Sequence, residues 1–240
     1  MRLNSFQIKK SWLMKLSVII PAYNEEATIL TILERVRAVP IDKEIIIVND
    51  CSRDRTREIL EALPAAPDLK ILHHERNQGK GAAIRTGQAA VTGDVVIIQD
   101  ADLEYDPAEY PKMWKFFHER QADAVFGSRY SGNEVMVDTF IHYYGNRFLT
   151  MCSNLLTNLH LTDMETCYKM VRADIFKQVT IECHCFGFEP EITAKLAKMR
   201  LRIFEVPIYY EPRNYDAGKK ITWRDGFKAL WYIVKFNLLR

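Results

Sequence analysis

A chain of 240 residues that is 48% hydrophobic and 27% charged is large enough for one α/β domain with a sizeable core. The formal net charge of +2 is too small for a general nucleic-acid-binding protein, so no nucleic-acid partner is expected and anion binding must be local. The five cysteines are odd in number and scattered, which argues against a disulfide framework and favours a reducing, cytoplasmic compartment.

The N-terminal residues 1–13 are expected to form an extension ahead of the first strand. The apolar run at 16–20 stops at Pro21, so it is too short for a signal-peptide core or a membrane span. We therefore expect this run to be the first strand, and we expect no export signal.

Short β-branched runs alternate with longer helical patterns along the rest of the chain. This alternation predicts an α/β fold with a mainly parallel sheet and helices on both of its faces. Strands are expected at 16–20, 44–49, 69–73, 95–99, 124–126 and 202–210. Helices are expected at 29–36, 55–63, 81–90 and 107–119, and the apolar stretch 138–160 also has helical spacing.

The C-terminal residues 216–240 are expected to form a basic loop followed by an amphipathic helix, after a main domain at 14–215. One helical stripe carries Trp223, Phe227, Leu230, Trp231, Val234 and Leu238. Basic residues surround the stripe, and such a helix can lie in a membrane interface. Packing on its own domain or on a partner is the alternative for this helix.

Polar and glycine-rich segments follow five of the expected strands. Because ligands of open α/β sheets bind beyond the carboxyl ends of the strands, these segments are the candidate site. They are residues 21–26, 50–54, 77–81, 100–106 and 127–129. Ordinary turns do not need so many acidic and basic side chains, so we expect a functional site at the carboxyl ends of the strands.

Two carboxylates one residue apart, Asp100 and Asp102, follow an apolar strand. Carboxylate oxygens suit Mg²⁺ or Mn²⁺, ions that keep positions open for substrate phosphates. Glu104 would add a third oxygen, so the predicted metal ligands are Asp100, Asp102 and Glu104. Capping of a turn is the alternative role for these residues.

Two further candidates, Asp50 and Lys80, would contact a nucleotide or an anion. Asp50 closes the second strand and can accept hydrogen bonds from a base, whereas Ser52 and Asp54 are more simply helix caps. Lys80, between two glycines before a helix, is expected to bind an anion, with a solvated turn lysine as the alternative. Glu189, near a helix start, is kept only as a possible site residue.

Two groups of basic residues would meet phosphates. Arg129 can bind a phosphate in a bidentate manner, and Arg213 with Lys219 forms a second basic group in a glycine-containing segment. A solvated face is the alternative role for the lysine.

The sequences of the strand-end segments are VIIPAYNEE at 18–26, VND at 48–50, NQGKG at 77–81, QDADL at 99–103 and FGSR at 126–129. In this order they resemble glycosyltransferase family 2, within it the branch of dolichol-phosphate mannosyltransferases and polyprenyl-phosphate glucosyltransferases. The resemblance covers about residues 15–222 and implies a GT-A fold. It also implies an inverting, metal-dependent transfer of a hexose from a nucleoside diphosphate sugar to a polyprenyl or dolichyl phosphate.

The resemblance gives the residues roles. Catalysis would depend on Asp102 and Arg129, with Arg129 holding the acceptor phosphate. The expected substrate-binding residues are Pro21, Tyr23, Asn24, Glu25, Asp50, Lys80, Asp100, Ala101, Arg129, Arg213 and Lys219. The segment 102–107 favours UDP-glucose over GDP-mannose as donor. Many members carry C-terminal membrane spans that this sequence lacks, so a peripheral position on the cytoplasmic face of a membrane is expected.

Three alternatives remain open at this point. A family 2 enzyme acting on a sugar hydroxyl is one, although the Gln-x-x-Arg-Trp motif of processive synthases is absent. A nucleotidyltransferase would have a basic, glycine-rich loop after the first strand, where this chain has residues 22–25. A non-catalytic module that binds nucleotide sugars is the third. The oligomeric state is not indicated by the sequence.

Overall fold

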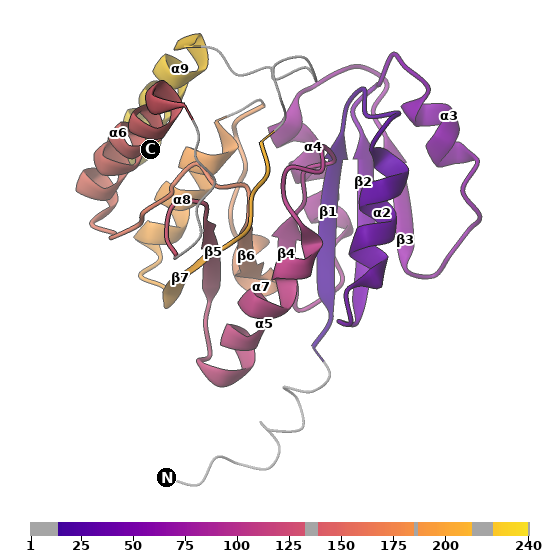
Figure 1. Ribbon diagram of the computed structural model, residues 1–240, viewed down its shortest axis with the longest axis horizontal. Helices are drawn as coiled ribbons and strands as arrows, with labels where there is room; N and C mark the ends of the chain where they lie inside the picture. Colours follow the sequence, from indigo (N-terminus) through magenta and orange to yellow (C-terminus); the bar gives the residue numbers. More distant parts are fainter. Residues whose placement is uncertain (1–13, 133–138, 185–186, 213–222, 240) are drawn as a thin grey trace, which may run out of the picture.

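The computed structural model describes residues 14–132, 139–184, 187–212 and 223–239. The expected extension at 1–13 and the predicted site residues Arg213 and Lys219 lie outside these ranges. The described residues form a seven-stranded sheet with the strand order β3-β2-β1-β4-β6-β5-β7 (Figure 1).

The sheet is parallel except for one strand. Strand β6 runs antiparallel to both of its neighbours, β4 and β5, whereas the other pairs are parallel. The strands are β1 Leu16–Ala22, β2 Lys43–Asn49, β3 Leu69–His73, β4 Val95–Ile98, β5 Ala124–Ser128, β6 Lys169–Arg172 and β7 Ile203–Pro207. The predicted mainly parallel sheet is confirmed, but β6 was not predicted.

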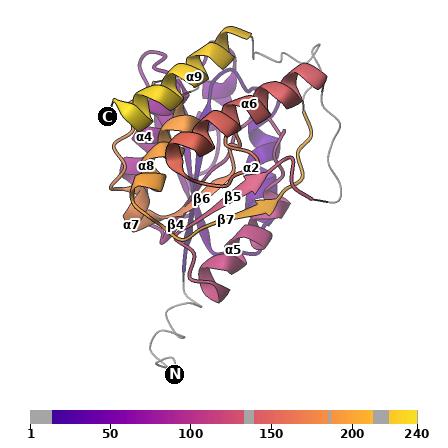
Figure 2. The same ribbon diagram turned by 90° about the vertical axis from the view of Figure 1, so that its left-hand side faces the viewer.

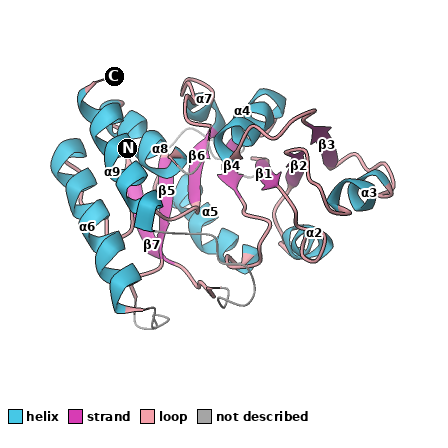
Figure 3. Ribbon diagram, turned by 90° about the horizontal axis from the view of Figure 1, so that it is seen from above, coloured by secondary structure: helices cyan, strands magenta, loops and turns pink. Residues whose placement is uncertain are grey.

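Helices cover both faces of the sheet, as the sequence predicted. Figure 3 shows α2 and α5 on one face, and α4 and α7 on the other. The helices are α2 Ile29–Ala38, α3 Thr56–Glu61, α4 Lys80–Ala90, α5 Tyr110–Glu119, α6 Phe140–Thr157, α7 Ala173–Phe176, α8 Phe188–Lys198 and α9 Trp223–Leu238. A short 3-10 helix, η1 Pro107–Glu109, precedes α5.

The core lies on both faces of the central strands. All but one residue of β1 and of β2 are buried, which is why their sequences are nearly continuous apolar runs rather than alternating ones. Helix α4 lies close to β1 because Gly87 has no side chain: a Cβ atom there would meet Ile19 Cγ2 at 2.6 Å.

Two long helices, α6 and α9, lie side by side beyond the β7 end of the sheet (Figure 2). Helix α9 packs on α8, where Phe236 meets Ala194, and both Phe236 and Ile233 are fully buried. The predicted C-terminal amphipathic helix is thus confirmed. Among the helices of the described ranges, none has the length and apolar character that a membrane crossing requires.

Candidate active site

The segments after β1 and β2 are joined by hydrogen bonds at the carboxyl edge of the sheet. The backbone N–H of Asn24 donates to Ser52 Oγ over 3.0 Å, and Asn24 Oδ1 accepts from the N–H of Arg53 over 2.8 Å. The N–H of Glu25 donates to Thr56 Oγ1. Asn24 and Ser52 therefore organise the loop in which Pro21, Tyr23 and Glu25 were predicted to bind the nucleoside.

Asp50 is buried at the end of β2, and its carboxylate organises the next loop. It accepts hydrogen bonds from the backbone N–H groups of Gln78 and Gly79, over 2.9 and 2.7 Å. Its Oδ1 atom also lies 2.6 Å from Nδ1 of His74. The predicted contact between Asp50 and a base stays a prediction; in the described structure Asp50 positions the turn before Lys80.

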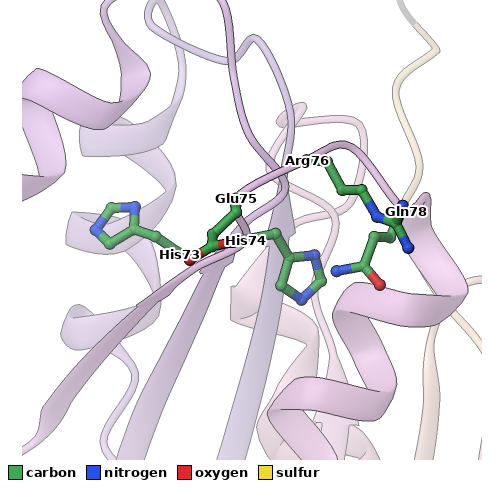
Figure 4. A pocket seen from close by; sticks show the side chains of 5 residues that line it. All are labelled: His73, His74, Glu75, Arg76 and Gln78. Carbon is green, nitrogen blue, oxygen red and sulfur yellow. The ribbon is translucent and has the colours of Figure 1, made fainter.

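An open depression of about 460 Å³ lies beside this aspartate, at the end of β3. It is lined by His73, His74, Glu75, Arg76 and Gln78 (Figure 4). The ring of His73 lies on the opposite side of the segment from that of His74, whose Nε2 is 2.9 Å from Thr86 Oγ1. Gln78 lies in the candidate segment 77–81, whereas the other four residues were not predicted for the site, because no motif marks residues 73–76.

Lys80 reaches from the first turn of α4 to the end of β4. Its Nζ lies 2.8 Å from Asp100 Oδ1 and 2.9 Å from Glu189 Oε1. Burial alone lowers the pKa of Lys80, but the charges of Asp100, Cys167 and Glu189 outweigh it and raise that pKa. The structure thus places Glu189, which the sequence left open, in the same cluster as the predicted residues Lys80 and Asp100.

The carboxylates after β4 differ in their surroundings. Asp100 and Asp102 are half-buried, and Asp102 Oδ1 accepts from the N–H of Glu104 over 3.1 Å. Glu104 Oε2 accepts from the hydroxyl of Tyr210 over 2.8 Å. Ala101 has a buried side chain, so it would meet a substrate through its backbone.

The donor set suits a divalent ion that keeps other ligands. Mg²⁺ is commonly held by one or two carboxylates together with water and substrate phosphates, and Asp100 and Asp102 provide such a pair. Within the described ranges, no three His, Cys, Asp or Glu side chains are grouped to hold a metal by themselves. A bound ion would therefore complete its coordination with water or with phosphate oxygens of the substrate.

Arg129, just past β5, forms a bidentate ion pair with the fully buried Asp163. Arg129 Nε lies 2.7 Å from Oδ2 and its Nη2 lies 2.8 Å from Oδ1. The guanidinium also lies 5.1 Å from the centre of the Tyr210 ring. Burial lowers the pKa of Arg129, but Asp163 raises it further, so the group stays charged. The sequence predicted Arg129 but not its partner.

Glu165 lies two residues beyond Asp163 and was not predicted to have a role. Its Oε1 atom is buried and has no hydrogen-bond partner among the residues that the structure describes. Burial, and then the charge of Glu189, raise the pKa of Glu165 to about 7. The buried Lys169 on β6 lowers it only in part. No charge pattern in the sequence around Glu165 marks this residue.

Comparison with known proteins gives the family. The model of glycosyl transferase family 2 matches residues 17–180. The chain is 32% identical over 232 residues to the low-salt glycan biosynthesis hexosyltransferase Agl6 of Haloferax volcanii, covering 93% of this chain but only 53% of that protein. It is 29% identical to undecaprenyl-phosphate mannosyltransferase of Micrococcus luteus, covering 86% of this chain and 87% of that one.

A solved structure shows the fold. The glucosyl-3-phosphoglycerate synthase of Mycobacterium tuberculosis, crystallised with Mn²⁺, UDP and glucosyl-3-phosphoglycerate, superimposes with a TM-score of 0.70. At 17% identity the match covers 99% of this chain and 86% of that one, so the expected GT-A fold is confirmed. With a family model that matches most of its length, the chain belongs to glycosyl transferase family 2.

Proposed function

We propose that this protein transfers a hexose from a nucleoside diphosphate sugar to a polyprenyl phosphate, with inversion at the anomeric carbon. The observation that carries the proposal is the separation of charge at one sheet edge. Asp100 and Asp102 follow β4, and the cationic Arg129, fixed by Asp163, follows β5. The names of two relatives, undecaprenyl-phosphate mannosyltransferase and dodecaprenyl-phosphate galacturonate synthase, support the acceptor.

The donor side would be built by the segments after β1, β2 and β4. Pro21, Tyr23, Asn24, Glu25 and Asp50 are proposed to surround the nucleoside. Arg213 and Lys219, in the segment before α9, are proposed to meet the diphosphate. UDP-glucose is the donor that we favour over GDP-mannose.

Asp100 and Asp102, with Glu104 beside them, would hold Mg²⁺ or Mn²⁺. When bound, the ion supplies positive charge next to the departing nucleoside diphosphate. Lys80 would contribute a further positive charge once its ion pair with Asp100 opens. Asp102 is therefore proposed to be catalytic through the metal that it holds.

The acceptor side needs no general base. A phosphate monoester has its second pKa near 6, so at neutral pH it is already a dianion and a nucleophile. The remaining task is to position the two anions and to offset their charge. In Arg129, Nε and Nη2 are occupied by Asp163. We propose that Nη1 donates to the acceptor phosphate, which aims an oxygen at the anomeric carbon.

Thermal unfolding in the presence of a panel of nucleoside diphosphate sugars with Mn²⁺ tests the donor. We expect UDP-glucose to raise the unfolding temperature most. A larger rise with GDP-mannose would identify GDP-mannose as the donor instead. No rise with any member of the panel would contradict the proposal. Because the acceptor is lipid-linked, we also propose that the protein works as a peripheral protein on the cytoplasmic face of a membrane.

A further inference from the structure

Helix α6 buries polar residues and exposes apolar ones, which is the reverse of an ordinary surface helix. Its buried residues are polar: Asn146, Thr150 and Ser153. Six large, mainly apolar residues of α6 have 51 to 79% of their surface accessible: Phe140, Ile141, Tyr144, Phe148, Met151 and Leu155. A helix on a water-exposed surface normally shows the opposite arrangement.

Hydrogen bonds hold the polar side of α6 against the segment 161–164. Asn146 Nδ2 donates to Asp163 Oδ1 over 3.1 Å, and Thr150 Oγ1 accepts from the N–H of Met164 over 3.1 Å. Asn154 donates to and accepts from the backbone of Leu161. Because these polar groups have partners inside the protein, the apolar side of α6 is fixed facing outward.

The neighbouring helix α9 also exposes large apolar residues. Phe227, Trp231 and Leu238 are exposed along one side, while the opposite side is buried on α8. Figure 2 shows α6 and α9 lying alongside one another. We call the exposed apolar residues of the two helices the α6–α9 surface. Large apolar residues exposed together on two neighbouring helices indicate an interaction site.

The charges of the two helices indicate what covers this surface. Helix α6 contains no Asp or Glu, and Asp225 is the single acidic residue of α9. Arg147 and Lys228 are exposed on them. A second copy would bring like charges together, whereas anionic lipid headgroups attract these groups while the apolar side chains enter the acyl boundary.

We propose that the α6–α9 surface docks the protein on an anionic lipid bilayer, with α6 as the principal contact. The inner side of α6 touches Asp163, the partner of Arg129. Docking would therefore place the arginine one helix diameter, ~10 Å, from the lipid surface, on which the headgroup of a lipid-linked phosphate lies. This orientation deepens the proposed function and rests on it for the identity of the acceptor.

Binding to vesicles without prenyl phosphate or donor tests the surface. Phe148→Glu and Leu155→Glu change two exposed positions of α6. Leu30→Glu is the matched control, because Leu30 is 44% exposed on α2, away from this surface. Deletion of α9 is a poorer test, since it removes the buried Ile233 and Phe236.

We expect the unchanged protein and Leu30→Glu to co-sediment with vesicles that contain phosphatidylglycerol, and less with phosphatidylcholine alone. Each α6 variant should lose binding by a factor on the order of ten, with an unchanged unfolding temperature. Absence of vesicle binding, or equal binding by the α6 variants, overturns the proposal. A dimer that dissociates in these variants, without vesicle binding, assigns the surface to a second copy instead. Vesicle binding without any sugar transfer would contradict only the proposed reaction.

Discussion

The ammonium of Lys80 lies 2.8 Å from a carboxylate oxygen of Asp100, one of the residues proposed to hold the divalent ion. A divalent ion bound to Asp100 would either displace the ammonium of Lys80 or be repelled by its positive charge. We therefore expect Lys80→Met to bind Mn²⁺ more tightly, by a factor on the order of ten, or about 1.4 kcal/mol. Titration calorimetry in the absence of donor measures this directly.

Lys112→Met is the matched control for that experiment. Lys112, on α5, pairs with Glu109 at the end of η1, so its loss should leave Mn²⁺ affinity unchanged. Equal affinity of the Lys80 variant and the unchanged protein would show that the lysine does not compete with the ion.

Asp102→Asn removes one negative charge while keeping the size of the side chain. If Asp102 holds the metal, transfer should become undetectable, and the unfolding temperature without metal should stay within a few degrees. Initial rates at saturating Mn²⁺ give the answer. Activity within a few-fold of the unchanged protein would remove Asp102 from the catalytic residues.

Arg129→Lys keeps the positive charge but loses the planar guanidinium. Transfer to polyprenyl phosphate should fall by a factor on the order of 10–100, or about 1.4–2.8 kcal/mol, while donor affinity stays near its original value. Because Asp163 is fully buried, stability should fall as well. Titration calorimetry measures donor affinity, and initial rates at varied acceptor concentration measure the use of the acceptor, so the two effects can be separated. A collapse of donor binding would place Arg129 on the donor side.

Glu165 gives the protein a predictable pH dependence. Its pKa is raised by burial to about 7, above the ordinary carboxyl value, so the folded state binds its proton more tightly than the unfolded state. This contribution to stability is present below the unfolded pKa and is lost as the pH rises toward 7.

Glu165→Gln should remove that dependence. Between pH 5 and 7, the unfolding free energy of the unchanged protein should fall relative to the variant, by at most about 1.4 kcal/mol per pH unit. Urea titrations at several pH values measure the difference. The facing charged groups Glu189, Lys169, Arg129 and Asp163 are the same in both proteins. Parallel curves would contradict the raised pKa.

Much of the sheet could be predicted, because its central strands are buried on both faces and their apolar runs are bounded by turn residues. Strand β6 could not be: it has four residues, and Lys169 within it is charged yet buried among backbone carbonyls. After β5 the chain passes through α6 and then returns beside β5 in the opposite direction, so β6 is antiparallel. Helix α6 was predicted from its spacing, but periodicity alone does not say which side of a helix faces inward.

The candidate site was predictable where residues directly follow a strand. Asp100, Asp102 and Arg129 do so, and a short local pattern revealed them. Asp163 could not be assigned to Arg129, because the two are 34 residues apart and only tertiary packing joins them. Glu189 joins Lys80 over a still longer separation of 109 residues.

The acceptor is the central claim, and one measurement tests it most directly. The purified full chain is incubated with labelled UDP-glucose, Mn²⁺ and two acceptors, a polyprenyl phosphate and an oligosaccharide that offers only hydroxyl groups. We predict a labelled prenyl phosphate sugar with the β configuration, and no labelled oligosaccharide. Label in the oligosaccharide, with none in the prenyl phosphate for any donor of the panel, would contradict the account.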